Sequence, residues 1–158
     1  MRGISSGKNP SNEVQGINLR PLCRVEAELA EPIVLPNTPS GTRRILEIVS
    51  LQLAGERLVA TMKGRAAADW LTLSPDGLIG TLDVRCTLET DDGALIFMQY
   101  AGRARIANSS EAVHRIYVAP RFDTGDERYT WLNYIQAVGK AVQPPGSKSL
   151  HYTFYEIE

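Results

Sequence analysis

A polar row in the segment 82–93 has residue types that can transfer protons. The segment reads L-D-V-R-C-T-L-E-T-D-D-G, and its alternation of apolar and polar residues predicts a β-strand with two distinct faces. The polar face holds Asp83, Arg85, Thr87 and Glu89. In a cavity shielded from water, a carboxylate and a hydroxyl can act as general base and acid, and an arginine can hold an anionic substrate.

An Asp-Gly pair at positions 92 and 93 is typical of a tight hairpin turn, after which the chain returns as a second strand. If that turn has two residues, Arg85 lies opposite Tyr100 and Thr87 lies opposite Met98. This register places a phenol beside the ionisable row. We therefore expect the hairpin to line a cavity in which Asp83, Thr87 and Met98 contact a substrate.

The catalytic roles that follow are specific. Asp69 or Glu89 is the expected base, Tyr100 the acid or oxyanion donor, and Arg85 an anchor for an anion. The alternative is a solvated strand face on which Arg85 pairs with Asp83 or Glu89. Such a cross-strand pair contributes only about 0.2–1 kcal/mol to stability.

The dipeptide Asp69-Trp70 is a second candidate site. At the rim of a barrel, the carboxylate of Asp69 can face the cavity while the indole of Trp70 closes it. The alternative is a helix-capping or turn aspartate beside a core tryptophan.

A third candidate lies between residues 120 and 134. A predicted strand over 129–138 places Tyr129, Trp131 and Asn133 on one face. Trp131 would form an apolar wall, Asn133 would donate to a carbonyl, and Arg121 would bind a carboxylate with two hydrogen bonds. The alternative is a core tryptophan, a buried asparagine with its hydrogen bonds satisfied, and an ion pair in a turn.

Short strands separated by Gly, Pro and Asp turns dominate the chain and indicate an all-β sandwich or barrel. Residues 1–20 are expected to form an extended or flexible arm and residues 21–158 one domain. The segment Pro32–Ser40, broken by three prolines, should be a connection or an edge strand. A short helical turn is predicted over 66–71. Further strands are predicted over 23–29, 44–53, 57–62, 113–118 and 150–157.

The composition of the chain argues against some classes of function. The chain has 158 residues, 43% of them hydrophobic and 22% charged, with a net charge of -1, so no basic surface indicates nucleic acid. No apolar run is long enough to span a bilayer. Cys23 and Cys86 fall on apolar strand faces and should be buried free thiols, which indicates a cytoplasmic protein.

Several catalytic motifs are missing from the sequence. It has no G-x-S-x-G, no G-x-G-x-x-G and no phosphate-binding loop. His114 and His151 lack neighbours at metal-ligand spacing. We therefore predict that no metal and no cofactor are used, and we expect neither nucleic acid nor membrane as a partner.

Longer motifs resemble the uncharacterised bacterial and fungal family known as domain of unknown function three-two-three-seven. They are Asp69-Trp70, Asp76-Gly77, the segment 82–94, P-R-F-x-T at 120–124, Y-x-W-L-N at 129–133, and the closing H-Y-T-F-Y-E-I. The resemblance implies a small closed antiparallel β-barrel similar to allene oxide cyclase and lipocalin-like (calycin-like) barrels. The chain departs from the family pattern at Val49-Ser50, where a glycine pair is common, and at Ala66–Ala68, which is often glycine-rich.

These observations lead to one main hypothesis. The barrel binds a small, partly apolar carbonyl, phenolic or carboxylate compound and catalyses proton transfer as an isomerase, cyclase or lyase. The alternatives are a carrier or sensor that binds the same ligand without catalysis, and a structural protein with a filled barrel. A dimer or trimer is expected in preference to a monomer.

Overall fold

The computed structural model describes residues 14–109 and 111–158. The first thirteen residues of the predicted N-terminal arm lie outside these ranges. The first strand begins at Leu19, and just before it Asn18 exchanges backbone hydrogen bonds with Glu158. Residues 18–20 of the predicted arm therefore pair with residues 156–158 near the C-terminus.

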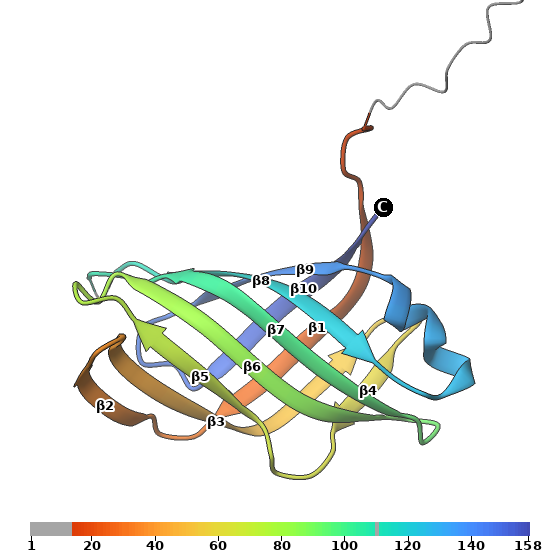
Figure 1. Cartoon of the computed structure of the whole chain (residues 1–158), viewed down its shortest axis with the longest axis horizontal. Coiled ribbons are helices and arrows are strands. Elements are labelled where there is room, and N and C mark those ends of the chain that lie inside the picture. The colour runs from red at the N-terminus through yellow and green to blue at the C-terminus, as the bar shows by residue number, and fades with distance from the viewer. Residues whose placement is uncertain (1–13, 110) are drawn as a thin grey trace, which may run out of the picture.

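Within the described ranges, the chain forms one antiparallel sheet of ten strands and a single short 3-10 helix (Figure 1). The elements are β1 (Leu19–Leu29), β2 (Ile33–Thr38), β3 (Gly41–Ala54), β4 (Val59–Met62), β5 (Ala68–Leu73), β6 (Ile79–Thr90), β7 (Leu95–Arg105), β8 (His114–Asp123), η1 (Glu127–Tyr134), β9 (Ala137–Gln143) and β10 (Ser149–Ile157). No helix in the described ranges has the length and apolar character needed to cross a membrane.

The sheet closes on itself as an eight-stranded barrel, which confirms the predicted fold. Its strands follow the order β1-β10-β9-β8-β7-β6, and β3 returns to pair with β1. Between β6 and β3 the wall is made by β4 and β5 in succession, since each pairs with both neighbours. β2 extends this wall by pairing with the N-terminal part of β3, so the segment Pro32–Ser40 does form an edge strand.

The hairpin of β6 and β7 corrects the predicted register. Thr90 donates its N–H to the Ala94 carbonyl at 2.9 Å, and Gly93 adopts a φ of 91°. The turn between them has three residues, with glycine in the left-handed position that such turns favour. A change of one residue in register exchanges the two faces of a strand. Tyr100 consequently lies opposite Val84, and Met98 lies opposite Cys86.

The apolar row of β6, and not its ionisable row, faces the barrel interior. The buried residues are Leu82, Val84, Cys86 and Leu88. Burying this row removes apolar surface from water, whereas burying the opposite row would desolvate three charges. The prediction that the ionisable row lines a cavity is therefore wrong. Cys86 and Cys23 are buried free thiols, as expected.

Two predicted elements differ in type from those in the structure. The segment around Asp69 forms strand β5 instead of a helical turn, because it completes the wall between β3 and β6. The segment predicted as a strand over 129–138 contains η1 and the start of β9. Asp126 caps η1 by accepting a hydrogen bond from the Arg128 N–H.

The two ends of the barrel are packed differently. At the closed end, η1 lies across the opening (Figure 1) and inserts Leu132, which is fully buried. Large side chains fill the space beside it, among them Leu58, Leu88, Ile96, Met98 and Phe154. At the open end, near β2 and the start of β8, several positions are small and an internal cavity remains.

Candidate active site

The cavity at the open end has a volume of about 240 Å³ and is lined mainly by apolar side chains. Ala27, Ala30 and Ala104 line it in places where larger side chains would fill the space. The cavity volume is somewhat smaller than the roughly 300–1,000 Å³ of pockets that bind drug-sized ligands. A cavity of this size suits a small organic molecule. The polar residues on its wall include Asp69, Tyr100, Tyr152, Arg44 and His114.

Asp69 is held on β5 with its carboxyl group inside the barrel, and only 7% of the residue is exposed. The β5–β6 ladder pairs Asp69 with Val84 and resumes only at Thr72 and Thr81. In this interval the Asp83 N–H donates to Oδ1 of Asp69 at 3.0 Å. The carboxyl group therefore completes the hydrogen bonding of the barrel wall while it lines the cavity.

Burial makes Asp69 an unusual acid. Desolvation raises the pKa of its carboxyl group to about 7, and the nearby Asp83 charge adds a smaller upward effect. The hydrogen bond from the Asp83 N–H acts in the opposite direction. A carboxyl group with a pKa near neutrality can both accept and release a proton under physiological conditions.

Two tyrosines share the cavity with Asp69. Tyr100 and Tyr152 have ring centroids 5.8 Å apart in an edge-on arrangement, and Phe154 packs against both rings. Burial and the charge of Asp69 raise the pKa of Tyr100 and of Tyr152. Both phenols therefore stay protonated and can act as hydrogen-bond donors.

Arg44 and His114 also line the cavity, from β3 and β8. His114 accepts a hydrogen bond from the Ala107 N–H at its Nδ1, at 2.9 Å, which leaves Nε2 as the protonated ring nitrogen. Burial, together with the positive charge of Arg44, lowers the pKa of His114. The imidazole is thus a neutral donor at physiological pH.

The structure brings together two of the predicted catalytic residues, Asp69 and Tyr100. It separates them from Arg85 and Glu89, which lie on the outer surface. Arg85 pairs with Asp83 at 3.6 Å, and Glu89 pairs with Lys63 at 3.0 Å. The alternative interpretation, a solvated strand face with ion pairs, describes this row, although the Arg85–Asp83 pair lies within β6 and does not cross between strands.

Four predicted ligand contacts are also absent from the cavity wall. Trp70 lies on the outer face of β5, where its ring stacks against the Arg85 guanidinium at 4.5 Å. Thr87 belongs to the same outer row, and Arg121 is exposed on β8. Met98 points inward, but it is fully buried in the packed core.

The third predicted cluster belongs to the closed end. Tyr129 donates its hydroxyl to Asp92 at 2.9 Å, and Asn133 exchanges two hydrogen bonds with the Thr124 backbone. Trp131 stacks under the Arg57 guanidinium at 4.5 Å. Because η1 replaces the predicted strand, these residues fasten the cap and do not contact the cavity.

Sequence reasoning missed Arg44, His114 and Tyr152 as cavity residues. The signal for Tyr152 was its place in the apolar row Leu150, Tyr152 and Phe154 of the last strand. Arg44 precedes Leu46 and Ile48 in a similar row. In each case a polar residue continues an apolar row, which marks a side chain that points into the barrel.

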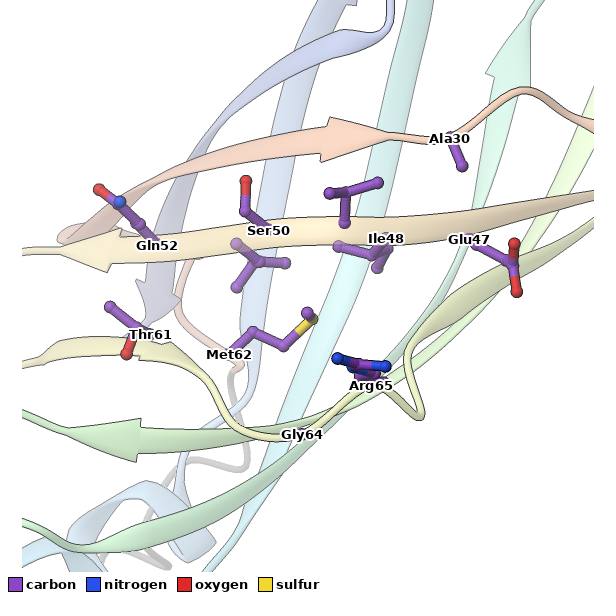
Figure 2. A pocket seen from close by; sticks show the side chains of 11 residues that line it. Ala30, Glu47, Ile48, Ser50, Gln52, Thr61, Met62, Gly64 and Arg65 are labelled. Carbon is purple, nitrogen blue, oxygen red and sulfur yellow. The ribbon is translucent and has the colours of Figure 1, made fainter.

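A second hollow, a groove of about 540 Å³, lies on the barrel wall where β4 diverges from β3 (Figure 2). Its floor includes Ile48 and Met62, and its charged residues, Glu47 and Arg65, are exposed. Val49 and Ser50, where the family usually has glycines, lie beside a register shift in the β1–β3 ladder. The groove lacks a buried ionisable group, so the internal cavity is the better candidate for chemistry.

In the part of the chain that the structure describes, no cluster of three or more His, Cys, Asp and Glu side chains could hold a metal ion. The candidate site is instead one buried carboxyl group with phenol, imidazole and guanidinium donors in an apolar cavity. Such a site suits proton transfer on a small organic molecule.

The chain belongs to the family described as "Protein of unknown function (DUF3237)", which it matches over residues 17–157. Among its relatives, the UPF0311 protein blr7842 of Bradyrhizobium diazoefficiens is 29% identical over 68% of this chain and 76% of that protein. A β-barrel-like protein from Acinetobacter baumannii covers 94% of this chain and all of its own, with 28% identity and a TM-score of 0.82.

One relative has a named activity. The hydroalkoxylation enzyme phnH of Penicillium herquei is 31% identical over 109 residues, which are 67% of this chain and 60% of that protein. Hydroalkoxylation is the addition of the O–H bond of an alcohol across a carbon–carbon double bond. At least one barrel similar to this one is therefore an enzyme.

Proposed function

We propose that the protein is an enzyme that catalyses proton transfer, without a cofactor, on a small, partly apolar hydroxy-carbonyl compound bound in the open end. The reaction class is an intramolecular addition, cyclisation or isomerisation. The observation that supports this most strongly is the Asp69 carboxyl group, which is buried in an apolar cavity and has its pKa raised to about 7. The named activity of the Penicillium relative belongs to the same class.

In the addition reaction, Asp69 acts first as a base. Its carboxylate removes the proton from a substrate hydroxyl while the hydroxyl oxygen bonds to the β-carbon of an alkene conjugated with a carbonyl. Negative charge moves to the carbonyl oxygen, where the Tyr100 and Tyr152 hydroxyls donate hydrogen bonds. Asp69 then returns its proton to the other alkene carbon. Atoms and charge balance, and nothing is oxidised or reduced.

The apolar wall contributes to each step. Because water is largely excluded, hydrogen bonds to the developing oxyanion are stronger than in solution. Leu71, Leu82 and Ile116 line the space between the polar groups and restrict the substrate to conformations in which its ends are close. Such restriction accelerates intramolecular reactions.

The test uses an ortho-hydroxyphenyl propenyl ketone, which cyclises to a chromanone with loss of enone absorbance. We expect the wild-type protein to accelerate cyclisation and Asp69→Asn to lose about 10²–10⁴-fold of that acceleration. The matched control is Glu89→Gln, which changes a carboxylate on the outer surface further along the adjacent strand β6 and should retain activity.

Equal acceleration by the wild-type and Asp69→Asn proteins would contradict the role given to Asp69. Binding of the ketone by the wild-type protein without any acceleration would favour the non-catalytic carrier. The rate should also rise with pH through about 7 and then level off, because the base is active only when ionised.

A further inference from the structure

Two buried side-chain polar atoms lack a hydrogen-bond partner among residues 14–109 and 111–158, and both belong to residues of the same cavity. They are Nε of Arg44 and the hydroxyl of Tyr152. Buried polar groups in folded proteins are nearly always paired, and each exception needs an explanation. Two exceptions on one cavity wall indicate that a ligand supplies the missing partners.

Arg44 is also the cavity's unpaired cation. Besides His114 and the two tyrosines, four ionisable side chains line the cavity: Glu31, Arg44, Asp69 and Lys148. Lys148 and Glu31 form an ion pair with each other. Arg44 forms no ion pair and no side-chain hydrogen bond with any described residue, so its partly buried guanidinium lacks a counter-ion. An uncompensated charge away from water costs free energy.

The register shows how Arg44 and Asp69 lie relative to each other. Arg44 pairs with Leu71, and Asp69 pairs with Leu46, so the two residues are diagonal neighbours on adjacent inward-facing positions. Arg44 also pairs with Val34 of the edge strand β2, which places it nearer the mouth. His114, at the start of β8, lies in the same region, and the charge of Arg44 contributes to lowering the pKa of His114.

The cavity therefore has two neighbouring polar groups, on successive inward-facing residue pairs of the β3–β5 ladder. Arg44 and the Nε2–H of His114 form the group nearer the mouth, and Asp69 with the two tyrosines forms the group nearer the interior. Apolar side chains, among them Leu46, Leu71 and Leu82, line the cavity around them.

We propose that the mouth is an anion subsite, in which Arg44 binds the carboxylate of a small amphipathic acid whose other end reaches Asp69 and Tyr152. The guanidinium binds through Nε–H and a neighbouring Nη–H, the planar pair of donors that matches a carboxylate. His114 adds a third, neutral donor. The orientation of the bound acid, with its other end at Asp69, rests on the proposed function. The anion subsite does not depend on that function and rests on Arg44.

The experiment compares carboxylic acids with their primary amides. Phenylacetate and para-coumarate, each with its amide, are titrated into the full-length protein at pH 6, where Asp69 is mostly protonated and the ligand acids are ionised. We expect the better acid to bind at least about tenfold more tightly than its amide, because a charge-assisted pair replaces a neutral hydrogen bond. In Arg44→Gln, the two affinities should become equal.

Two further variants serve as controls. Arg43→Gln removes the adjacent arginine, which points to the opposite face of β3, and should keep the preference for the acid. Arg44→Lys keeps the charge without the paired donors and should retain part of the preference, which provides a second test if Arg44→Gln does not fold.

Equal binding of acid and amide by the wild-type protein, absence of binding by both acids, or an undiminished preference in both Arg44 variants would overturn the proposal. Asp69→Asn separates the two proposals. It should abolish cyclisation and leave the preference for the acid intact. If the variant retains cyclisation while the preference depends on Arg44, the proposed function fails and the anion subsite stands.

Discussion

The closed and open ends of the barrel share seven strands, with β4 completing the wall towards the closed end and β5 towards the open end, yet only the closed end is filled. At the closed end, Phe154, Leu88 and Leu132 are almost completely inaccessible to solvent, and η1 contributes Leu132 to this core. At the open end, alanines on the wall leave about 240 Å³ unfilled. Interiors packed at normal density stabilise a fold, whereas a cavity gives up part of that stability for space in which a ligand binds.

Aspartates at the two ends show the same contrast. At the closed end, Arg128 donates side-chain and backbone hydrogen bonds to Asp126, which lower the pKa of Asp126 to about 2. At the open end, burial raises the pKa of Asp69 to about 7. The first carboxylate fastens the N-terminus of η1. The second carboxyl group, that of Asp69, has a pKa near 7 and can therefore exchange protons at physiological pH.

Replacement of one leucine at each end tests the packing difference most strongly. Leu88 and Leu82 occupy the same inward row of β6, one in the packed core and the other on the cavity wall. We expect Leu88→Ala to lower the free energy of unfolding by about 3–5 kcal/mol, because it creates a new cavity. Leu82→Ala should lower the free energy of unfolding by less, because the neighbours of Leu82 already border the cavity.

Urea unfolding of both variants measures this difference. If the cost of Leu82→Ala equals or exceeds that of Leu88→Ala, the two ends do not differ in packing as described.

Substitution of Asp69 tests the contrast between the two aspartates through the pH dependence of the free energy of unfolding. In the unfolded chain this carboxyl ionises near pH 4, whereas in the native protein it ionises only near 7. Native stability therefore falls as pH rises from 4 to 7 and is constant above that range. Asp69→Asn removes this loss, so its stability relative to the wild type should increase between pH 4 and pH 8. The upper limit is roughly 4 kcal/mol at about 1.36 kcal/mol for each pKa unit.

Denaturant unfolding at the two pH values gives the required comparison. Asparagine can still accept the Asp83 N–H, so a variant whose relative stability does not change with pH would show that Asp69 ionises normally in the native state.

The smallest expected effect belongs to the outer row of β6. Arg85 stacks on Trp70 and pairs with Asp83, with its side chain about half exposed. Arg85→Ala should lower the free energy of unfolding by less than about 1 kcal/mol. A loss above about 2 kcal/mol in thermal or urea unfolding would contradict the placement of this row on the surface.

These differences also explain what could be predicted from the sequence. Alternation between apolar and polar residues predicted the buried cysteines and an all-β sandwich or barrel. The family resemblance implied the closed barrel, and three prolines indicated a connection or an edge strand at 32–40. Alternation did not establish which face of β6 looks inward, because the choice depended on one extra residue in the turn at 91–93. That residue brings Tyr100 to the apolar row of Val84.

The candidate site was predictable only in part, for a similar physical reason. Asp69 was correctly expected to face the cavity, but Trp70 follows it directly in a strand and must point outward. Arg44, His114 and Tyr152 come from three distant strands, and their meeting at one cavity depends on the closed topology. The aromatic residues of 129–134 indicated a strand, and a capping aspartate with tertiary packing favoured the helix instead.

The measurement that tests the central claim most directly is the pKa of the Asp69 carboxyl group, followed by ¹³C NMR across pH 3 to 9. Loss of the signal in Asp69→Asn assigns it, and Asp126 of the cap, whose pKa is lowered to about 2, should stay ionised across most of this range and provides an internal reference. A midpoint near 7 is the predicted result and supports a desolvated proton-transfer group in the open end. A midpoint near 4 would show a solvated carboxylate and contradict the proposed chemistry.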